Sequence, residues 1–253
     1  MNSTPVDQAE TDKRGDVRRW FCDPLGRRLL EEERRYLEEA LPYLFGYHLV
    51  QVGRLAEADL IGSSRVLHRV VMDQDYASTA IAPSFYGYPD QMPIESCSID
   101  VLLLHHSLEF ETEPHQVLRE ADRVLIPEGH VVIICFNPWS LWGLWRLVLK
   151  RRGRAPWSGQ FLSHARLKDW LALLGFDLTM SKPYFFRPPL RNERIMQKLQ
   201  FLDRLGARWW PLFAGAHLII AKKRVATLTP LKPRWRSRHD RVTAPGVVRP
   251  APN

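Results

Sequence analysis

The sequence predicts an α/β protein with an open, largely parallel sheet, because two buried strands flank a helix in one short stretch. Residues 101–104 and 131–136 are apolar runs without alternation, as expected of strands that are covered on both faces. Residues 114–125, which lie between them, carry apolar side chains at helical spacing. The unit is therefore expected to be a right-handed βαβ crossover.

Proline and glycine punctuate this crossover. Pro114 suits the first turn of the helix, and Pro127-Glu128-Gly129 is expected to end the helix and turn the chain into the next strand. Open α/β sheets bind ligands beyond the carboxyl ends of their strands. A site is therefore expected near residues 105–109.

The remaining elements follow in the order that such a sheet requires. Residues 25–44 combine leucines and charged side chains at helical spacing, which predicts an amphipathic helix. Residues 162–174 predict another helix, with Ser163 as its N-cap and Gly175 as its stop. The other expected strands span residues 47–52, 65–72, 83–88, 176–186 and 216–221.

The bulk composition is that of a globular protein with one main domain. The chain has 253 residues, enough to bury a full core, and 45% of them are hydrophobic. No apolar run has the length of a membrane span, and the N-terminus lacks the apolar core of a secretory signal. Three widely spaced cysteines indicate reduced thiols, so a cytoplasmic location is expected.

The positive charge of the chain is concentrated at its end. Nine basic side chains and one acid follow Ala221, which accounts for the whole net charge of +8. The first 221 residues hold 27 basic and 27 acidic side chains. The folded part is therefore expected to be neutral overall.

The centre of the chain resembles a known family. Residues 92–100 have the sequence MPIESCSID, Leu108-Glu109 follow the fourth expected strand, and residues 123–129 have the sequence RVLIPEG. This pattern resembles the second half of a type 11 methyltransferase domain, of the class I S-adenosylmethionine-dependent methyltransferases. The resemblance implies a Rossmann-like sheet of about seven strands, with helices on both faces and an antiparallel last hairpin. It also implies S-adenosylmethionine as the cofactor and a methyl acceptor that the sequence does not identify.

The same resemblance implies four cofactor-binding residues. Gly53, after the first strand, would let the backbone approach the methionyl group, since a Cβ would block it. Asp73, after the second strand, would accept the ribose hydroxyls. Asp90 is the acid nearest to the position that contacts the adenine amine. His105, just past the fourth strand, would face the cofactor.

The glycine motif departs from the family pattern. The acidic residue and three glycines of the family fall on Gln51, Gly53, Leu55 and Glu57, so one glycine is kept. A non-catalytic relative that has lost cofactor binding is therefore the alternative. Methyl transfer depends mainly on aligning the acceptor with an electrophilic methyl group, so no general base is assigned.

No metal site is predicted, although histidines and glutamates crowd residues 105–115. A strand end followed by an acidic helix start accounts for this cluster, and no partner motif stands elsewhere in the sequence. The motifs of the common hydrolases, nucleotidases and zinc proteins are absent from the sequence as well.

Residues 137–154 combine three tryptophans, large aliphatic side chains and a basic cluster. This composition suits an interfacial membrane helix, but the position after the fifth strand favours a lid or a core-packing segment. The tail around Trp235 could contact a membrane surface or a nucleic acid weakly, and a solvated extension is the simpler interpretation. A membrane- or RNA-associated adaptor is thus a further alternative.

The expected organisation has three parts. Residues 1–24 form a flexible N-terminal segment, residues 25–224 a methyltransferase-like domain, and residues 225–253 a disordered basic tail. Within the domain, residues 137–160 are an aromatic and basic insertion, and residues 187–214 are an insertion between the last two strands.

Overall fold

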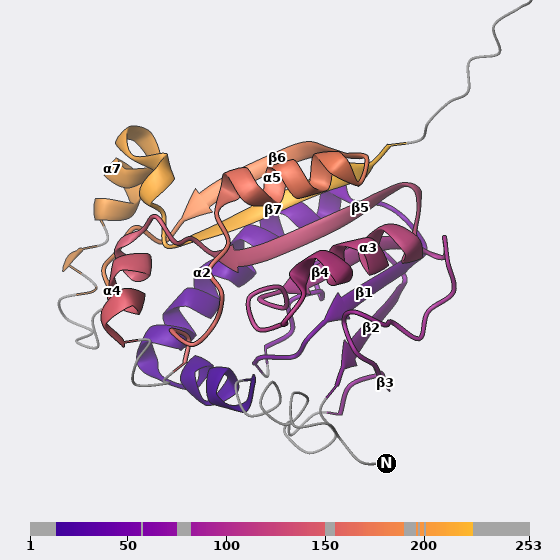
Figure 1. Cartoon of the computed structure of the whole chain (residues 1–253), viewed down its shortest axis with the longest axis horizontal. Coiled ribbons are helices and arrows are strands. Elements are labelled where there is room, and N and C mark those ends of the chain that lie inside the picture. The colour runs from indigo at the N-terminus through magenta and orange to yellow at the C-terminus, as the bar shows by residue number, and fades with distance from the viewer. Residues whose placement is uncertain are drawn as a thin grey trace, which may run out of the picture.

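The computed structural model describes residues 14–56, 58–74, 82–149, 155–189 and 196–224, the last range without residues 197 and 200. Its centre is a seven-stranded sheet with the strand order β3-β2-β1-β4-β5-β7-β6 (Figure 1). The strands are β1 (His48–Val52), β2 (His68–Asp73), β3 (Phe85–Tyr86), β4 (Ile99–His105), β5 (Leu125–Phe136), β6 (Phe176–Tyr184) and β7 (Ala216–Lys223).

Strands β1 to β5 are parallel, and β7 runs antiparallel to both of its neighbours, β5 and β6. Leu102 pairs with Val50 on one side and with Val131 on the other, at the centre of the sheet. This confirms the predicted fold class, including the antiparallel last hairpin. The carboxyl ends of β1, β2 and β4 therefore meet at one edge of the sheet.

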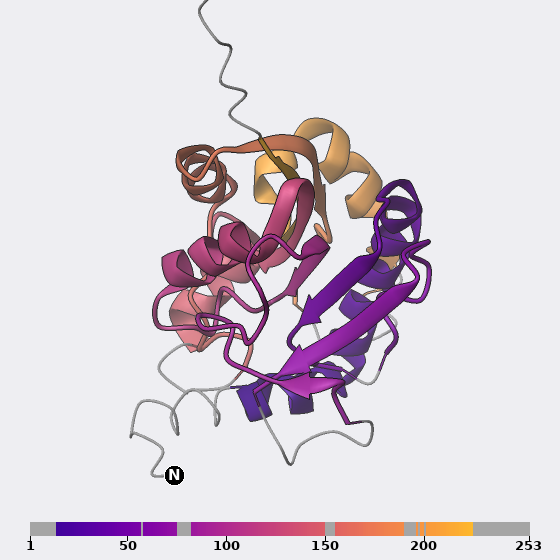
Figure 2. The same cartoon turned by 90° about the vertical axis from the view of Figure 1, so that its right-hand side faces the viewer.

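Helices cover both faces of the sheet, as Figures 1 and 2 show. Leucines of α2 (Pro24–Ala40) pack on one face against Leu49 and Leu103. On the other face, α3 (Pro114–Val124) and α5 (His164–Leu173) pack against Leu102 and its neighbours. Two apolar clusters therefore share the sheet as their common wall.

The shorter helices are η1 (Leu41–Tyr43), α4 (Leu141–Leu149), α7 (Phe201–Trp209) and η3 (Pro211–Phe213). Ser163 caps α5 as predicted, because its hydroxyl accepts a hydrogen bond from the Arg166 amide. No helix within the described ranges is both long and apolar enough to cross a membrane.

Strand β5 begins earlier than the sequence predicts. It starts at Leu125, so Pro127-Glu128-Gly129 lies inside the strand and not in a turn before it. The pairing register with β4 shifts between Ile99 and Val101, and Glu128 has a φ of +68°. The strand accommodates the expected turn residues as a bulge, which is where proline and a left-handed residue are tolerated in a sheet.

The N-terminal part differs from the flexible segment that we expected at residues 1–24. Residues 14–21 are helical, and Val17 and Phe21 are buried in the same cluster as α2. Val17, Trp20 and Phe21 recur at helical spacing, so one side of this turn is apolar. We call residues 14–21 the N-terminal segment; residues 1–13 and the tail from residue 225 lie outside the described residues.

Candidate functional site

Gly53 stands directly after β1, where the sequence predicts a close backbone approach. Its φ is +83°, and its amide donates to the carbonyl of Met72 at the end of β2 (N···O 2.9 Å). A Cβ at this position would lie 3.2 Å from Ser107 Oγ and 3.6 Å from Arg14 Nη1. Both the backbone conformation and the crowding therefore require glycine here.

Asp73 ends β2 one strand away and is buried. Its Oδ2 accepts hydrogen bonds from the Arg54 amide (2.9 Å) and from Arg18 Nη2 (2.6 Å). Its Oδ1 accepts from the Gln74 amide (2.7 Å). Both carboxylate oxygens face donors at the carboxyl edge of the sheet, where the sequence predicts a ribose ligand.

The N-terminal segment supplies the cations of this edge. The Arg18 Nε donates to the carbonyl of Arg54 (2.9 Å), in the turn that follows Gly53. Arg14 is buried and forms an ion pair with Glu111, while its Nε has no hydrogen-bond partner. Figures 1 and 2 show this indigo helical turn beside the arrowheads of β1 and β2. The segment therefore lies directly over the predicted cofactor position.

Leu55 does not fill that position, although it replaces a glycine of the family motif. It is buried in the cluster that packs under α2. Gln51, at the acidic position of the motif, donates to the Gly53 carbonyl (3.0 Å) and so holds the turn. Glu57 lies outside the described residues.

His105 turns its side chain away from Gly53. Only its carbonyl approaches that residue, 3.7 Å from the position of a Cβ. The imidazole Nε2 lies 2.8 Å from Oε2 of Glu33 in α2, and Phe21 packs against the ring. The side chain of His105 therefore belongs to a buried network, and contact between His105 and the cofactor stays a prediction.

This buried network joins five polar side chains beneath the N-terminal segment. His106 Nε2 lies 2.9 Å from Glu33 Oε1, and His106 Nδ1 lies 2.8 Å from Glu109 Oε1. The Tyr184 hydroxyl donates to Glu33 Oε1 (3.2 Å), and the Phe136 amide donates to Glu109 Oε1 (2.7 Å). Each of these side chains is almost fully buried, so the network is dry.

Burial and charge pairing set the protonation states of the network. Burial alone would raise the pKa of Glu33, but the charge of His106 and hydrogen bonds from both histidines lower it to about 2. Burial lowers the pKa of His106, but the carboxylates of Glu33 and Glu109 raise it to about 10. Burial holds the pKa of His105 below its ordinary value against the pull of Glu33. At neutral pH the network therefore contains a Glu33 anion, a His106 cation and a neutral His105.

Glu33, His105 and His106 are also the described residues whose arrangement could hold a metal ion, since their donor atoms all lie within 4.8 Å of one another. Glu33 completes the cluster that the sequence showed only in part. Both Nε2 atoms already pair with the Glu33 carboxylate. His105 Nδ1 has no hydrogen-bond partner and can accept a proton.

Asp90 lies in the turn of residues 88–91, beyond the end of β3, and is half-buried. Gly87, between β3 and this turn, donates its amide to the Asp73 carbonyl (3.0 Å). The turn is thus tied to the strand end that carries Asp73. Contact between Asp90 and an adenine amine stays a prediction.

Sequence reasoning missed Arg14, Arg18 and Glu33. A signal for Glu33 was present, because it follows Leu29 and precedes Leu37 by four residues and so stands in the apolar stripe of its helix. The two arginines are also four residues apart, on a short turn with apolar neighbours. Their partners, Asp73 and Glu111, are far away in sequence, and this pairing could not be predicted.

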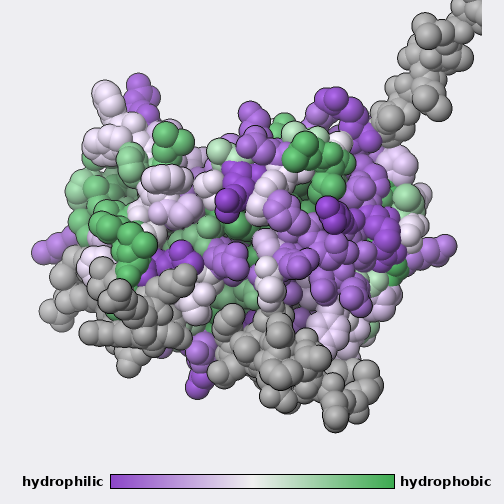
Figure 3. Space-filling view, viewed as in Figure 1, coloured by the Kyte–Doolittle hydropathy of each residue, from purple (hydrophilic) through white to green (hydrophobic). Residues whose placement is uncertain are grey.

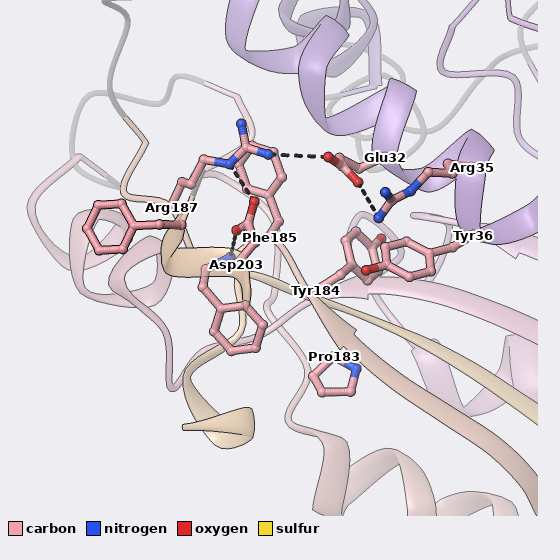
Figure 4. A pocket seen from close by; sticks show the side chains of 10 residues that line it. Glu32, Arg35, Tyr36, Pro183, Tyr184, Phe185, Arg187 and Asp203 are labelled. Carbon is pink, nitrogen blue, oxygen red and sulfur yellow. Dashed lines mark hydrogen bonds and ion pairs between the residues drawn. The ribbon is translucent and has the colours of Figure 1, made fainter. Parts of the chain in front are cut away.

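A cavity of about 500 Å³ lies between α2, β6 and α7 (Figure 4). Arg187 crosses it, with Nη2 3.2 Å from Glu32 Oε1 and Nε 2.6 Å from Asp203 Oδ2. The ring of Tyr184 lines the cavity and packs against Tyr36 with the ring centroids 5.1 Å apart, while its hydroxyl reaches Glu33. Tyr184 therefore links the cavity to the buried network.

Comparison with known proteins agrees with this geometry. A family model described as a methyltransferase domain matches residues 84–133. The solved structure of an S-adenosylmethionine-dependent methyltransferase of Thermotoga maritima is 16% identical, with a TM-score of 0.53, and the match covers 81% of this chain and 94% of that one. The [4+2]-cyclase SpnF is 15% identical, with a TM-score of 0.52 and coverage of 76% and 80%.

The fold and the matched segment define a class I S-adenosylmethionine-dependent methyltransferase domain. S-adenosylmethionine is the cofactor that goes with this domain. The chain belongs to the family of the uncharacterized protein YafS of Escherichia coli K12, with which it shares 30% identity over 215 residues, or 84% of each chain.

The strand-end residues fit the cofactor. Gly53 leaves a cradle that a Cβ would fill, and Asp73 presents two carboxylate oxygens at the end of the neighbouring strand. The N-terminal segment now covers these positions with Arg14 and Arg18. The sheet edge therefore fits the cofactor, and in this structure the N-terminal segment covers it.

Proposed function

We propose that the chain transfers a methyl group from S-adenosylmethionine to an acceptor that is still to be identified. The single observation that carries this proposal is the position of Gly53 directly after β1 and of Asp73 at the end of the adjacent parallel strand β2. S-adenosylmethionine, when bound, supplies an electrophilic methyl group. Asp73 would hold the ribose, Gly53 would admit the methionyl group, and Asp90 is the candidate for the adenine amine.

Cofactor binding on this proposal requires the N-terminal segment to leave the site. Both oxygens of Asp73 are engaged, one of them by the Arg18 guanidinium at 2.6 Å. Oδ2 already accepts from Arg18 and from the Arg54 amide, so a ribose hydroxyl would have to displace Arg18 to use it. The segment therefore acts as a cover, and its arginines exchange partners when the cofactor enters.

The proposed place of action is the cytoplasm. Cys22, Cys97 and Cys135 form no disulfide, and burial raises the pKa of Cys135 well above that of an ordinary thiol. An unreactive buried thiol together with unpaired exposed thiols is typical of a reducing compartment.

Calorimetric titration of the full chain with S-adenosylmethionine and S-adenosylhomocysteine tests the binding step. We expect saturable binding and a higher Tm, because a ligand at about 100 times its Kd adds about 2.7 kcal/mol to the folded state. Asp73→Ala should abolish both effects. Asp177→Ala, which removes an exposed carboxylate paired with Arg224, is the matched control and should leave them intact.

Arg14 and Arg18 also favour a second candidate function, because they cover the cofactor position. If the segment never leaves, the protein is a methyltransferase-like protein without cofactor binding. The double variant Arg14→Ala/Arg18→Ala distinguishes the two functions: absence of binding by both the wild type and this variant would establish the non-catalytic one. A bound adenosyl compound, found by mass spectrometry in protein purified without added ligand, would exclude it.

A further inference from the structure

Exposed apolar side chains gather at one end of the molecule. Eleven of the seventeen large hydrophobic residues that are exposed in the described part lie on α4, α7, η3 and the residues beside them. They are therefore a patch and not scattered surface residues. Figure 3 shows this patch as the green surface on the left, over α4 and α7. We call it the aromatic patch.

The two parts of the patch are joined. The Asn137 side-chain amide, just before α4, donates to the carbonyls of Leu212 (2.7 Å) and Ala214 (2.9 Å) beside η3. A groove of about 390 Å³ runs along α4, with Phe213 of η3 as part of its wall. The patch thus forms a continuous surface, although its parts are some seventy residues apart in sequence.

Trp142 fixes the orientation of α4. Its ring is buried and stacks on Phe136 at 5.6 Å, and its Nε1 donates to the Arg187 carbonyl (2.9 Å). Because one side of α4 is held in the core in this way, the opposite side is held outward. Leu144 and Leu147 on that side are 59% and 70% exposed. Trp142 therefore packs in the core, as expected of one side of this segment, whereas the apolar side chains on the outward side of α4 remain largely exposed in the described part of the chain.

Tryptophan dominates the exposed side chains of the patch. Trp139, Trp145, Trp209 and Trp210 are 43–71% exposed, and every other tryptophan in the described residues is at least partly buried. Indole combines a large apolar surface with a polar N–H, which suits the boundary between lipid headgroups and acyl chains. No other part of the described surface has this composition.

Basic residues predominate in the sequence around the patch. The sequence contains no Asp or Glu from residue 129 to 168, or from residue 204 to 239. Residues 146–154 alone contain five basic side chains. The acid of α7, Asp203, is engaged by Arg187 at 2.6 Å. Among the described residues, Arg146 lies in the last turn of α4 and Arg208 in the last turn of α7, so both helices of the aromatic patch carry a cation.

Because exposed tryptophans and basic side chains occur together here, we propose that the aromatic patch docks the protein onto an anionic lipid bilayer. The outward side chains enter the headgroup region, and the neighbouring Lys and Arg side chains attract acidic lipids. Association is peripheral, in line with short helices that cannot cross a membrane. The proposal does not depend on methyl transfer.

Sedimentation of the full chain with lipid vesicles tests the proposal. We expect binding to vesicles that contain phosphatidylglycerol, little binding to pure phosphatidylcholine, and weaker binding at high salt. Leu144→Glu/Leu212→Glu should reduce the partition coefficient at least about tenfold, because it places two charges in the apolar contact. Brominated lipids should quench the tryptophan fluorescence of the wild type and not that of this variant.

The matched control is Leu67→Glu/Leu173→Glu. These leucines are 86% and 85% exposed and lie away from the patch, before β2 and at the end of α5. This variant changes the net charge equally and should bind like the wild type. Equal loss in both variants would overturn the proposal, because it would show a general charge effect.

Two further outcomes would also overturn it. The basic tail is the competing membrane contact, so Arg234→Glu/Arg236→Glu should keep the quenching by brominated lipids; its complete loss would assign binding to the tail. Light scattering after gel filtration tests a second copy as the occupant. A wild-type dimer that Leu144→Glu/Leu212→Glu converts to a monomer, without vesicle binding by either, would show a protein interface.

Discussion

At the scale of single residues, Glu33 is the group with the strongest effect on its surroundings. It is fully buried and accepts hydrogen bonds from two histidines and a tyrosine. Removing one partner from a buried charge pair leaves the other charge without compensation. Glu33 therefore fixes the charge of His106, which in turn is held by Glu109.

We expect Glu33→Gln to destabilise the protein by about 3–5 kcal/mol, the usual cost of breaking a buried ion pair. Urea unfolding followed by circular dichroism measures this loss. Glu38→Gln is the control on the same helix, since Glu38 is about half exposed and pairs with Arg34. An equal effect of the two substitutions would show that the network does not stabilise the fold.

On the proposed function, Arg18 is the side chain that the cofactor must displace from Asp73. We expect Arg18→Ala to raise the affinity for S-adenosylhomocysteine several-fold, because Asp73 then loses a guanidinium that must be displaced. Calorimetric titration gives the Kd. Arg19→Ala, at an exposed arginine paired with Asp16, should leave the Kd unchanged. A weaker affinity in Arg18→Ala would mean that Arg18 binds the cofactor instead of competing with it.

The candidate site could be predicted from sequence only where a residue depends on its own strand. Gly53 and Asp73 stand at strand ends, and the strands are visible as apolar runs, so their positions follow. Arg18, by contrast, reaches Asp73 across 55 residues. Nothing in the local sequence of either residue indicates this contact, because it arises only when the segment folds over the sheet edge.

At the scale of elements, the N-terminal segment is the part whose position should change. We expect faster amide hydrogen exchange in residues 14–21 when S-adenosylhomocysteine is added, because the cofactor displaces them. Residues of β1 and β2 should exchange more slowly under the same conditions. Mass spectrometry of peptides resolves the two effects. Protection of both regions would show that the segment closes over the cofactor and is not expelled by it.

Most elements were predicted because each one carries its own pattern. The helix α3 and strand β4 match their apolar spacing within a few residues. The start of β5 was wrong, since Pro127 and Gly129 are turn residues by local preference. Pairing with β4 on one side and β7 on the other keeps them in the strand. Tertiary pairing is thus what overrides the local signal.

At the scale of the whole molecule, the buried charges set a window of pH for stability. The pKa of Glu33 falls from 4.5 to about 2 on folding, so its contribution is present above pH 4.5 and is lost as the pH falls toward 2. The pKa of His106 rises from 6.5 to about 10, so its contribution is present below pH 6.5 and is lost as the pH rises toward 10.

His217 narrows the pH range of maximum stability on its acid side. Burial lowers its pKa from 6.5 to about 4, so its neutral form stabilises the fold above pH 6.5 and this contribution is lost as the pH falls through 4. We expect the free energy of unfolding to be greatest near pH 6–7, and to fall on both sides. Urea titrations across this range measure it, and a flat profile above pH 7 would contradict the protonated state of His106.

A substitution at Gly26 would separate the N-terminal segment from α2 without changing Gly53 or Asp73. A methyl group there would come within 2.2 Å of the Trp20 carbonyl oxygen and 2.7 Å of the Phe21 Cα. The backbone of residues 20–21 would therefore have to move away from the start of α2. Gly26 lies in the first turn of α2, and the end of the N-terminal segment packs directly against it. Gly26→Ala would therefore shift the N-terminal segment from the sheet edge and uncover Gly53 and Asp73, with neither residue itself substituted.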